Sequence, residues 1–246
     1  MFILSNTSLR HAAIVMDGNN RWARQRGLLS IDGHKAGVER IRDILSVCHD
    51  NEMEVLTVFA FSSENWRRPT VEVNALMGLF HLYLRKESKK LRRDGIKLRV
   101  IGNRQRFSKK ICKAIVEAEA IANNGKLTLI IAADYGGKWD IVNAAKKLTT
   151  DVLHGKRELD SVDEDIFDEY TCLSDFPPVD MLIRTGNEHR ISNFLLWQCA
   201  YSELFFSEKL WPDFHKRDLE SIISEYYTRQ RRFGLNGQQL AGNYLA

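Results

Sequence analysis

The chain has 246 residues, of which 44% are hydrophobic and 28% charged, which is typical of a soluble globular protein and long enough for one large α/β domain. Its formal net charge of +4 suits anionic small substrates or a membrane surface but does not require nucleic acid. Four widely spaced cysteines exclude a disulfide or zinc framework, and no apolar run reaches membrane-spanning length, which predicts a cytoplasmic protein with peripheral contact to the inner membrane face.

Short apolar runs alternate along the chain with segments of helical periodicity. Strands are expected at residues 11–16, 55–61, 98–101, 127–133, 179–184 and 203–206. Helices are expected at 21–26, 38–48, 70–94, 107–122, 138–153, 163–173, 194–199 and 218–231. These recurring units predict a single α/β domain over 1–246, with one parallel sheet, helices on both faces, and flexible ends at about 1–10 and 235–246.

The first strand ends in a polar turn, Asp17-Gly18-Asn19-Asn20, and the chain continues as a helix with Arg21 near its start. A strand that ends in such a turn is where open α/β sheets bind ligands, and the backbone N–H groups at a helix start attract anions. We therefore expect this turn to hold a diphosphate, with Asp17 facing a metal or a polarised substrate. The alternative is an ordinary strand–helix turn in which Asp17 caps the helix.

Three polar loops, 17–22, 62–68 and 184–193, each follow an apolar strand, and the carboxyl ends of parallel strands meet at one edge of a sheet. Their arginines could neutralise phosphate oxygens, and two carboxylates are of the kind that holds magnesium. Each arginine alone would be more usual as a surface residue, but their joint placement favours a phosphate site. The members of the group are Arg21, Arg68, Arg184 and Arg190, the carboxylates Asp17 and Glu203, and the polar side chains Ser62, Ser192, Asn65, His34 and His189.

Other phosphate chemistries lack their signatures. The chain has no G-x-x-x-x-G-K-[ST] and no G-x-G-x-x-G after the first strand, which argues against P-loop and dinucleotide sites. The acidic run 163–169 is typical of a solvated helix start rather than an aspartate-rich metal site. The helix 70–94 is apolar nearly all round between 75 and 84, so it requires cover on two sides, from a large core, a partner chain or an apolar ligand.

Several longer motifs occur in a fixed order from about residue 11 to 234 and closely resemble the cis-prenyltransferase family. They are Met16-Asp17-Gly18-Asn19, Arg21-Trp22, Phe61-Ser62-Ser63-Glu64-Asn65-Trp66, Arg68-Pro69, Arg184-Thr185-Gly186, Glu188-His189-Arg190-Ile191-Ser192-Asn193-Phe194 and Trp211-Pro212-Asp213-Phe214. The resemblance implies a magnesium-dependent homodimeric transferase that adds isopentenyl diphosphate units to farnesyl diphosphate with cis double bonds. The expected product is a long polyprenyl diphosphate of the undecaprenyl type, a lipid carrier precursor for peptidoglycan and cell-wall synthesis.

The resemblance also implies residue roles. Asp17 would bind Mg²⁺ and help the allylic diphosphate leave, Asn65 would lie near the proton lost after condensation, and Glu203 would support the metal, in its own or a partner subunit's site. The residues that would line the allylic diphosphate are Gly18, Asn19, Asn20, Arg21 and His34; those that would hold isopentenyl diphosphate are Arg184, Arg190 and Ser192; those that would complete the pocket are Trp22, Ser62, Ser63, Glu64, Trp66, Arg68 and Ile191.

A growing hydrocarbon product needs an apolar tunnel. We expect the helix 70–94 and the strand 127–133 to form its walls, with Leu127 near the far end.

Three positions depart from the family pattern. Asn20 and Asn187 stand where the family commonly has glycine, and asparagine tolerates positive φ better than most residues. Ser30 stands where a basic residue is expected, which puts affinity for the allylic substrate at issue.

Three other functions are weighed against this interpretation. A phosphatase with Asp17 as covalent nucleophile would need a second aspartate two residues later, where the chain has Asn19. A non-catalytic family member that only binds a partner is opposed by the retained polar residues of the motifs. A nucleic-acid-binding protein could use the basic runs 85–93 and 229–232, but these runs lack interleaved aromatic residues.

Overall fold

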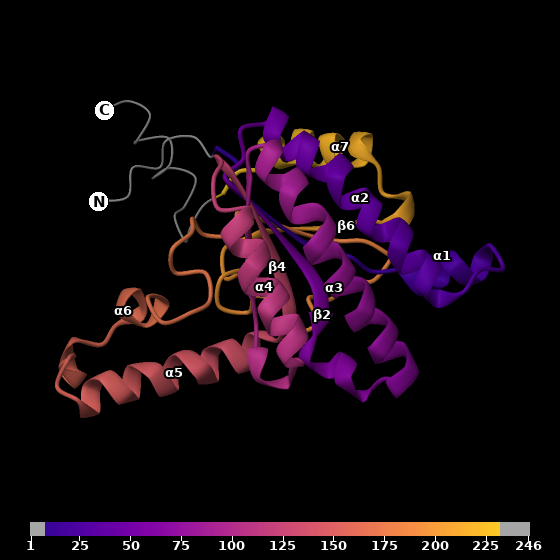
Figure 1. The fold of residues 1–246 in the computed structure, drawn as a ribbon. Helices are drawn as coiled ribbons and strands as arrows, with labels where there is room; N and C mark the ends of the chain where they lie inside the picture. The colour runs from indigo at the N-terminus through magenta and orange to yellow at the C-terminus, as the bar shows by residue number, and fades with distance from the viewer. Residues whose placement is uncertain (1–7, 232–246) are drawn as a thin grey trace.

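A single parallel sheet is the centre of the fold. In the computed structural model (Figure 1), which describes residues 8–231, six strands take the order β3-β4-β2-β1-β5-β6, and every neighbouring pair is parallel. The strands are β1 (His11–Val15), β2 (Val55–Ser62), β3 (Ile96–Ile101), β4 (Leu127–Tyr135), β5 (Met181–Arg184) and β6 (Glu203–Phe206). β1 and β4 are buried along their whole length, as continuous apolar runs predict for strands covered on both faces. The predicted parallel sheet is confirmed.

Helices connect the strands. The α-helices of the described residues are α1 (Asn19–Gln25), α2 (Ser30–Asp50), α3 (Thr70–Arg93), α4 (Lys109–Ile121), α5 (Gly137–Leu153), α6 (Glu164–Asp168) and α7 (Lys216–Thr228). Four short 3-10 helices are η1 (Ser63–Arg67), η2 (Arg104–Arg106), η3 (Leu159–Ser161) and η4 (Trp211–Asp213). Among residues 8–231, no helix is both long and apolar enough to cross a membrane.

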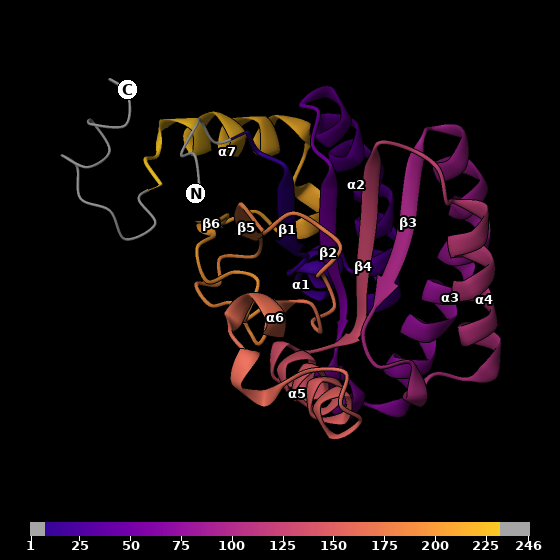
Figure 2. The ribbon, with the colours of Figure 1, turned by 90° about the vertical axis from the view of Figure 1, so that its left-hand side faces the viewer.

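Different parts of the chain cover the two faces of the sheet (Figure 2). α2, α3 and α4 lie on one face, over the larger buried cluster, which includes Leu129 of β4. The next residue, Ile130, points to the opposite face and belongs to a second cluster, with Leu173 and Phe194 of the later chain. The side chains alternate because successive residues of a strand point to opposite faces of the sheet. α5, α6 and the segment after them lie on the second face.

Two expectations about local structure are wrong. No helix forms at 194–199, because Ser192, Asn193 and Leu195 have φ values of 50°, 62° and 45°, in the left-handed region that a right-handed helix does not use. The acidic helix α6 ends at Asp168, well before residue 173. Residue 9, expected in a flexible end, is a leucine only 2% exposed. The expected flexible tail 235–246 lies outside the described residues.

The order of the strands creates a crevice at their carboxyl ends. From β1 the chain continues to β2 on one side, whereas from β5 it continues to β6 on the other side. The connections that follow these two adjacent strands therefore diverge, and ligands of open α/β sheets bind at such a switch point. β1 ends just before Asp17 and β5 ends at Arg184, so the fold itself brings the first and third predicted loops together.

Candidate active site

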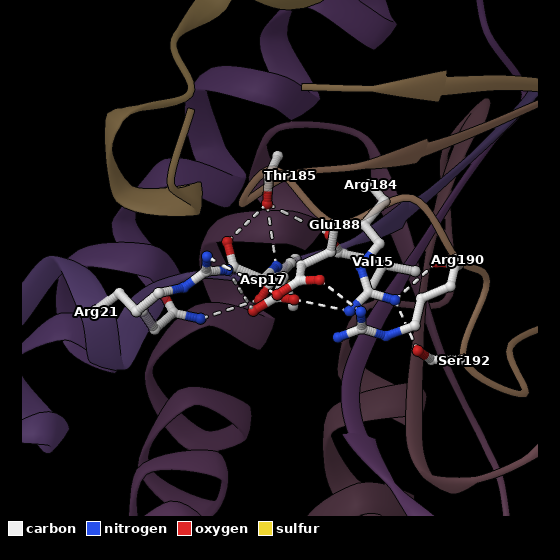
Figure 3. Close-up of polar contacts among 10 residues, drawn as sticks. Val15, Asp17, Arg21, Arg184, Thr185, Glu188, Arg190 and Ser192 are labelled. Carbon is white, nitrogen blue, oxygen red and sulfur yellow. Dashed lines mark hydrogen bonds and ion pairs between the residues drawn. The ribbon is translucent and has the colours of Figure 1, made fainter. Parts of the chain in front are cut away.

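Asp17 lies at the centre of the site, directly after β1. Its Oδ2 accepts a hydrogen bond from Arg184 Nη2 at 2.7 Å, and its Oδ1 accepts one from Arg21 Nη2 at 3.3 Å (Figure 3). The Thr185 hydroxyl accepts a hydrogen bond from the Asp17 N–H at 3.0 Å and donates one to the Asp17 carbonyl at 2.8 Å. The residue that caps α1 is Gly18, so the alternative in which Asp17 caps this helix is wrong. The carboxylate is held toward the crevice instead.

Arg184 is the buried cation of the site, with a side chain only 6% exposed. Its Nη1 donates to the Ser192 hydroxyl at 2.6 Å and to the Arg190 carbonyl at 2.7 Å. Its Nε is buried and has no hydrogen-bond partner among residues 8–231. A guanidinium that is fixed in this way presents a rigid donor set, which suits phosphate oxygens better than a flexible lysine would.

A chain of ion pairs extends from Asp17 to the surface (Figure 3). Arg21 contacts Asp17 and lies 4.0 Å from Glu188 Oε1 through Nη1, and Glu188 in turn pairs with Arg190. Together with Arg184, three cations face two carboxylates, which leaves one positive charge in excess. Arg21 and Arg190 have side chains 42% and 58% exposed, so water screens their ion pairs with Asp17 and Glu188.

The turn after β5 approaches Asp17 closely, and its backbone conformation at residue 186 favours glycine. Gly186 has a φ of +88°, and a Cβ there would lie 2.5 Å from Arg21 Nη2 and 3.2 Å from the Asp17 carbonyl carbon. Asn187 follows with a φ of 57°, so asparagine does take a left-handed position there. Asn20 instead lies in the first turn of α1 without positive φ, so this explanation does not extend to it.

A cavity of about 600 Å³ opens beside Asp17 and continues between the sheet, α2 and α3. The predicted site residues that line it are Asp17, Asn19, His34, Ser62, Glu64, Asn65, Arg68, Arg184 and Ser192. Apolar side chains line the rest, among them Ile41 of α2, Phe80 of α3 and Ile131 of β4. The apolar turns of α3 that needed cover therefore face this cavity. Leu127 is only 1% exposed and does not line it, although it shares a buried cluster with Ile131.

His34 is the histidine of the cavity lining. Burial, assisted by the nearby charge of Arg68, lowers the pKa of its imidazole to about 4. Its Nε2 is buried and, within the described part of the chain, has no hydrogen-bond partner. At neutral pH the ring is uncharged, so it can donate or accept one hydrogen bond at the cavity wall but adds no charge there.

Asn65 has a structural bond as well as a place at the cavity. Its Oδ1 accepts a hydrogen bond from the Ser62 N–H at 3.1 Å, which forms one half of a capping box at the start of η1. Its neighbour Glu64 accepts a hydrogen bond from Asn193 Nδ2 at 2.8 Å. Burial alone would raise the pKa of Glu64, but this bond and others nearby lower it, so the residue is a carboxylate at neutral pH. The second loop is therefore locked to the third.

Several predicted residues support the site from outside the cavity. Trp22 donates through Nε1 to Asp213 Oδ1 at 2.7 Å, and its ring lies under the Arg26 guanidinium. Trp66 packs edge-on against Phe61 at 5.2 Å. The predicted residues that the structure does not place in the cavity lining are Gly18, Asn20, Arg21, Trp22, Ser63, Trp66, Arg190, Ile191 and Glu203. His189 packs against the ring of Phe206 instead.

Glu203 is not brought to Asp17 within one chain. It is the first residue of β6 and lies level with Met181, three residues before the Arg184 end of β5. β5 separates its strand from β1, and its carboxylate pairs with Arg229 at 2.9 Å. Residues 8–231 contain no cluster of three or more His, Cys, Asp or Glu that could hold a metal ion.

Two residues of the cavity lining were missed as functional by the sequence interpretation. Asn193 accepts hydrogen bonds from the N–H groups of Gly137 and Lys138, and it also holds Glu64, so it joins three segments. The backbone N–H of Trp211 donates a hydrogen bond to the Asp17 carbonyl at 2.9 Å. Both stand inside quoted motifs, but nothing in the sequence shows that they contact loops more than fifty residues away.

Comparisons with known proteins agree with this geometry. A family model described as putative undecaprenyl diphosphate synthase matches residues 15–234. The chain is 50% identical over 232 residues to a Pseudomonas aeruginosa protein named ditrans,polycis-undecaprenyl-diphosphate synthase ((2E,6E)-farnesyl-diphosphate specific), covering 94% of this chain and 92% of that protein. It is 49% identical over 226 residues to the Escherichia coli K12 protein of the same name, covering 92% and 89% of the two chains.

Solved structures of the family share the fold. Lavandulyl diphosphate synthase from Lavandula x intermedia, solved in complex with dimethylallyl diphosphate, superposes with a TM-score of 0.89 at 36% identity, covering 92% of this chain and 98% of that one. A probable undecaprenyl diphosphate synthase from Campylobacter jejuni gives a TM-score of 0.79 at 33% identity, covering 93% and 100%. The chain belongs to the cis-prenyltransferase family described as putative undecaprenyl diphosphate synthases.

Proposed function

We propose that the chain condenses isopentenyl diphosphate units with farnesyl diphosphate and makes a long cis-polyprenyl diphosphate, of undecaprenyl length, for cell-wall lipid carriers. One observation carries the proposal: a cluster of arginines around Asp17 stands at the mouth of a cavity whose inner wall is apolar. The arginine cluster suits the diphosphate groups of the substrates, and the apolar wall suits their hydrocarbon chains. The names of the relatives from Pseudomonas and Escherichia state farnesyl diphosphate specificity and an undecaprenyl diphosphate product for those proteins.

The proposed step breaks the C–O bond of the allylic diphosphate and joins its carbon to the alkene of isopentenyl diphosphate, from which one proton is then lost. Arg184, Arg190 and Ser192 would hold the diphosphate of isopentenyl diphosphate, because Arg184 Nη1 donates to the Arg190 carbonyl at 2.7 Å and to the Ser192 hydroxyl at 2.6 Å, which brings the three residues together. The turn 17–21 and His34 would line the allylic diphosphate. Holding both heads at one crevice aligns the reacting carbons, and such positioning supplies much of the acceleration.

The donor set around Asp17 suits Mg²⁺. Magnesium is usually held by one or two carboxylates together with substrate phosphates rather than by an all-protein cage. Asp17 offers one carboxylate that is 30% exposed at the crevice, and its longer ion pair, at 3.3 Å with the half-exposed Arg21, is exchangeable. When bound, the ion would neutralise the charge that develops on the leaving diphosphate. Asp17 would orient it, and Arg21 would share the neutralisation.

In a homodimer, Glu203 could support the metal in the site of the partner subunit. β6 is an edge strand of the sheet, and apolar side chains are exposed along and beside it: Tyr201, Leu204, Phe206 and Tyr227. Within residues 8–231 no strand pairs with the outer edge of β6, and an edge of this composition favours pairing with another chain. A second copy on this edge would bury these side chains and could carry Glu203 toward the partner's crevice.

Subunit mixing tests this arrangement. If Glu203 completes the partner's site, a hybrid of Asp17→Ala and Glu203→Ala subunits contains one intact site. Random mixing of the two inactive variants should then restore about a quarter of wild-type activity, since half the dimers are hybrids with one site each. If both residues act within one chain, every site keeps a defect and no activity returns.

Product analysis tests the function itself. Wild-type chain is incubated with farnesyl diphosphate, labelled isopentenyl diphosphate and Mg²⁺, and the chain length of the products is determined. The proposal expects a long polyprenyl diphosphate that disappears when a chelator is added. A folded, dimeric protein that forms no product would favour the non-catalytic alternative, with Ser30 as the first residue to restore to arginine.

A further inference from the structure

Three large apolar side chains are exposed on two neighbouring segments, the loop from α1 to α2 and the first turn of α3. Leu29 is 72% exposed, Val71 is 82% exposed, and Leu28 is 45% exposed. Figure 1 shows α1 and the loop after it projecting from the body of the molecule. Single exposed apolar residues are ordinary, but a group of them at one projecting site marks an interaction surface.

A groove of about 360 Å³ lies between these segments. Leu29 and Ile31 form one side of it, and Val71 and Ala75 form the other. His34 and Leu76 line both this groove and the main cavity, so the groove adjoins the cavity that would hold the growing chain. Asn20 and Ser30 also line the groove, so it meets the cavity at the end where the allylic diphosphate is expected, beside the apolar wall at Leu76.

Cations surround the rim. Arg26 pairs with Asp213, and Arg68 pairs with Glu72. Arg24 in α1 and Arg67 at the end of η1 are exposed just before these two segments in the sequence, and neither takes part in an ion pair within residues 8–231. The surface around the exposed leucines and valine thus carries uncompensated positive charge, which complements an anionic surface.

We propose that this face docks on an anionic lipid bilayer, with Leu28, Leu29 and Val71 inserted among the acyl chains and the adjoining groove opening the cavity to the bilayer. The proposal deepens the proposed function, because it gives a water-insoluble polyprenyl product a route from the cavity into lipid. Apolar side chains supply the insertion, and basic residues beside them add the attraction to anionic headgroups. A peripheral protein needs two such signals for stable binding.

Vesicle flotation tests the docking surface. The full chain is mixed with vesicles of phosphatidylglycerol and phosphatidylcholine in equal parts, or of phosphatidylcholine alone. The wild type should float with the anionic vesicles, bind neutral vesicles less, and lose binding as salt rises. The double variant Leu29→Gln, Val71→Gln should bind anionic vesicles about 10-fold more weakly or worse, because both inserted side chains become polar.

Leu153→Gln is the matched control, since Leu153 is 79% exposed at the end of α5, outside the groove. It should bind vesicles as the wild type does, and all variants should keep the wild-type melting temperature. The double variant should also keep wild-type turnover of farnesyl diphosphate in vesicle-free buffer, because neither residue lines the cavity.

The possible failures are distinguishable. Wild-type chain that makes product but ignores vesicles, or a double variant that binds as well as Leu153→Gln, would overturn the docking surface. A change in the molecular mass of the double variant in solution would show that the groove is a contact between subunits, which also overturns it. Vesicle binding without any product would overturn the proposed function and leave the surface standing.

Discussion

Arg184 reaches across the crevice between β5 and β1 and donates a hydrogen bond from Nη2 to Asp17 Oδ2 at 2.7 Å. The two residues stand 167 positions apart in the sequence, and the parallel pairing of their strands alone brings them together. The contact holds the carboxylate and the guanidinium in the geometry that substrate and metal would meet, so the site is largely preorganised before anything binds.

Replacing Arg184 with lysine tests whether the two separate nitrogens of the guanidinium, Nη1 and Nη2, are required. Arg184→Lys keeps the charge but cannot bond Asp17, Ser192 and the Arg190 carbonyl at once. We expect kcat/KM for isopentenyl diphosphate to fall by about 10²-fold to 10³-fold, with a clear rise in KM. Arg157→Lys, at a surface pair with Glu169, is the control and should behave as the wild type. Kinetics of Arg184→Lys close to wild type would mean that charge alone suffices.

Gly186→Ala tests the close approach of the turn to Asp17. The new Cβ would meet Arg21 Nη2 at 2.5 Å and would also strain a left-handed residue. Gly155 has a similar φ of +68° but nothing within 4 Å, so Gly155→Ala measures the strain alone. Both variants should lose about 1 kcal/mol of unfolding free energy. Only Gly186→Ala should also lose about 10-fold or more of its turnover, because small displacements at a reacting centre are costly. Equal turnover in the two variants would show that the approach is unimportant.

The buried histidines make stability depend on pH. Burial lowers the pKa of fully buried His11 to about 4, whereas an unfolded histidine titrates near 6.5. The unfolded state therefore binds the proton first, so the contribution is complete above pH 6.5 and is lost as the pH falls toward 4. Its full size is about 3 kcal/mol. His34 acts in the same direction, because its pKa is also lowered to about 4.

Urea unfolding at pH 7 and pH 5 measures this loss. In the folded chain His11 Nδ1 donates to the Pro177 carbonyl and Nε2 accepts from the Thr57 hydroxyl, both at 2.8 Å. His11→Asn removes the titrating group, so its unfolding free energy should fall less between the two pH values than that of the wild type. The exposed His154→Asn should keep the wild-type difference. Identical differences in all three chains would exclude His11 as the source.

Product length should follow the volume of the cavity. Ala133 lines the cavity near its mouth, so Ala133→Phe should fill it and shorten the products. Leu127 lies farther along the same buried cluster, outside the lining, and becomes important only when a long chain extends that far. Leu127→Ala should therefore lengthen the products, as read by chromatography of the labelled polyprenols. An unchanged distribution in both variants would contradict the assignment of this cavity as the product tunnel.

The sequence predicted what depends on local pattern and on strand order. Apolar runs followed by polar turns placed Asp17, Asn65 and Arg184 at one edge of the sheet, and the structure brings them to one cavity. The helix expected at 194–199 failed because left-handed residues such as Asn193 are set by contacts with distant loops.

Side-chain direction was harder to predict than position. Trp22 stands in a site motif but bonds to Asp213, 191 residues away, and no local signal shows this. Glu203 shares the chemistry of a metal ligand, yet its place in the register of β6 puts it away from Asp17 in the same chain. The proposed role of Glu203 would require a second subunit, and the contacts within one chain carry no sign of it.

The most direct test of the account compares Asp17→Ala with the wild type in the incorporation of labelled isopentenyl diphosphate into polyprenyl diphosphate at saturating Mg²⁺. The account predicts that the variant keeps the wild-type melting temperature and loses about 10³-fold or more of the incorporation rate, because the metal and the leaving diphosphate lose their carboxylate. A folded Asp17→Ala chain that incorporates label at close to the wild-type rate would contradict it.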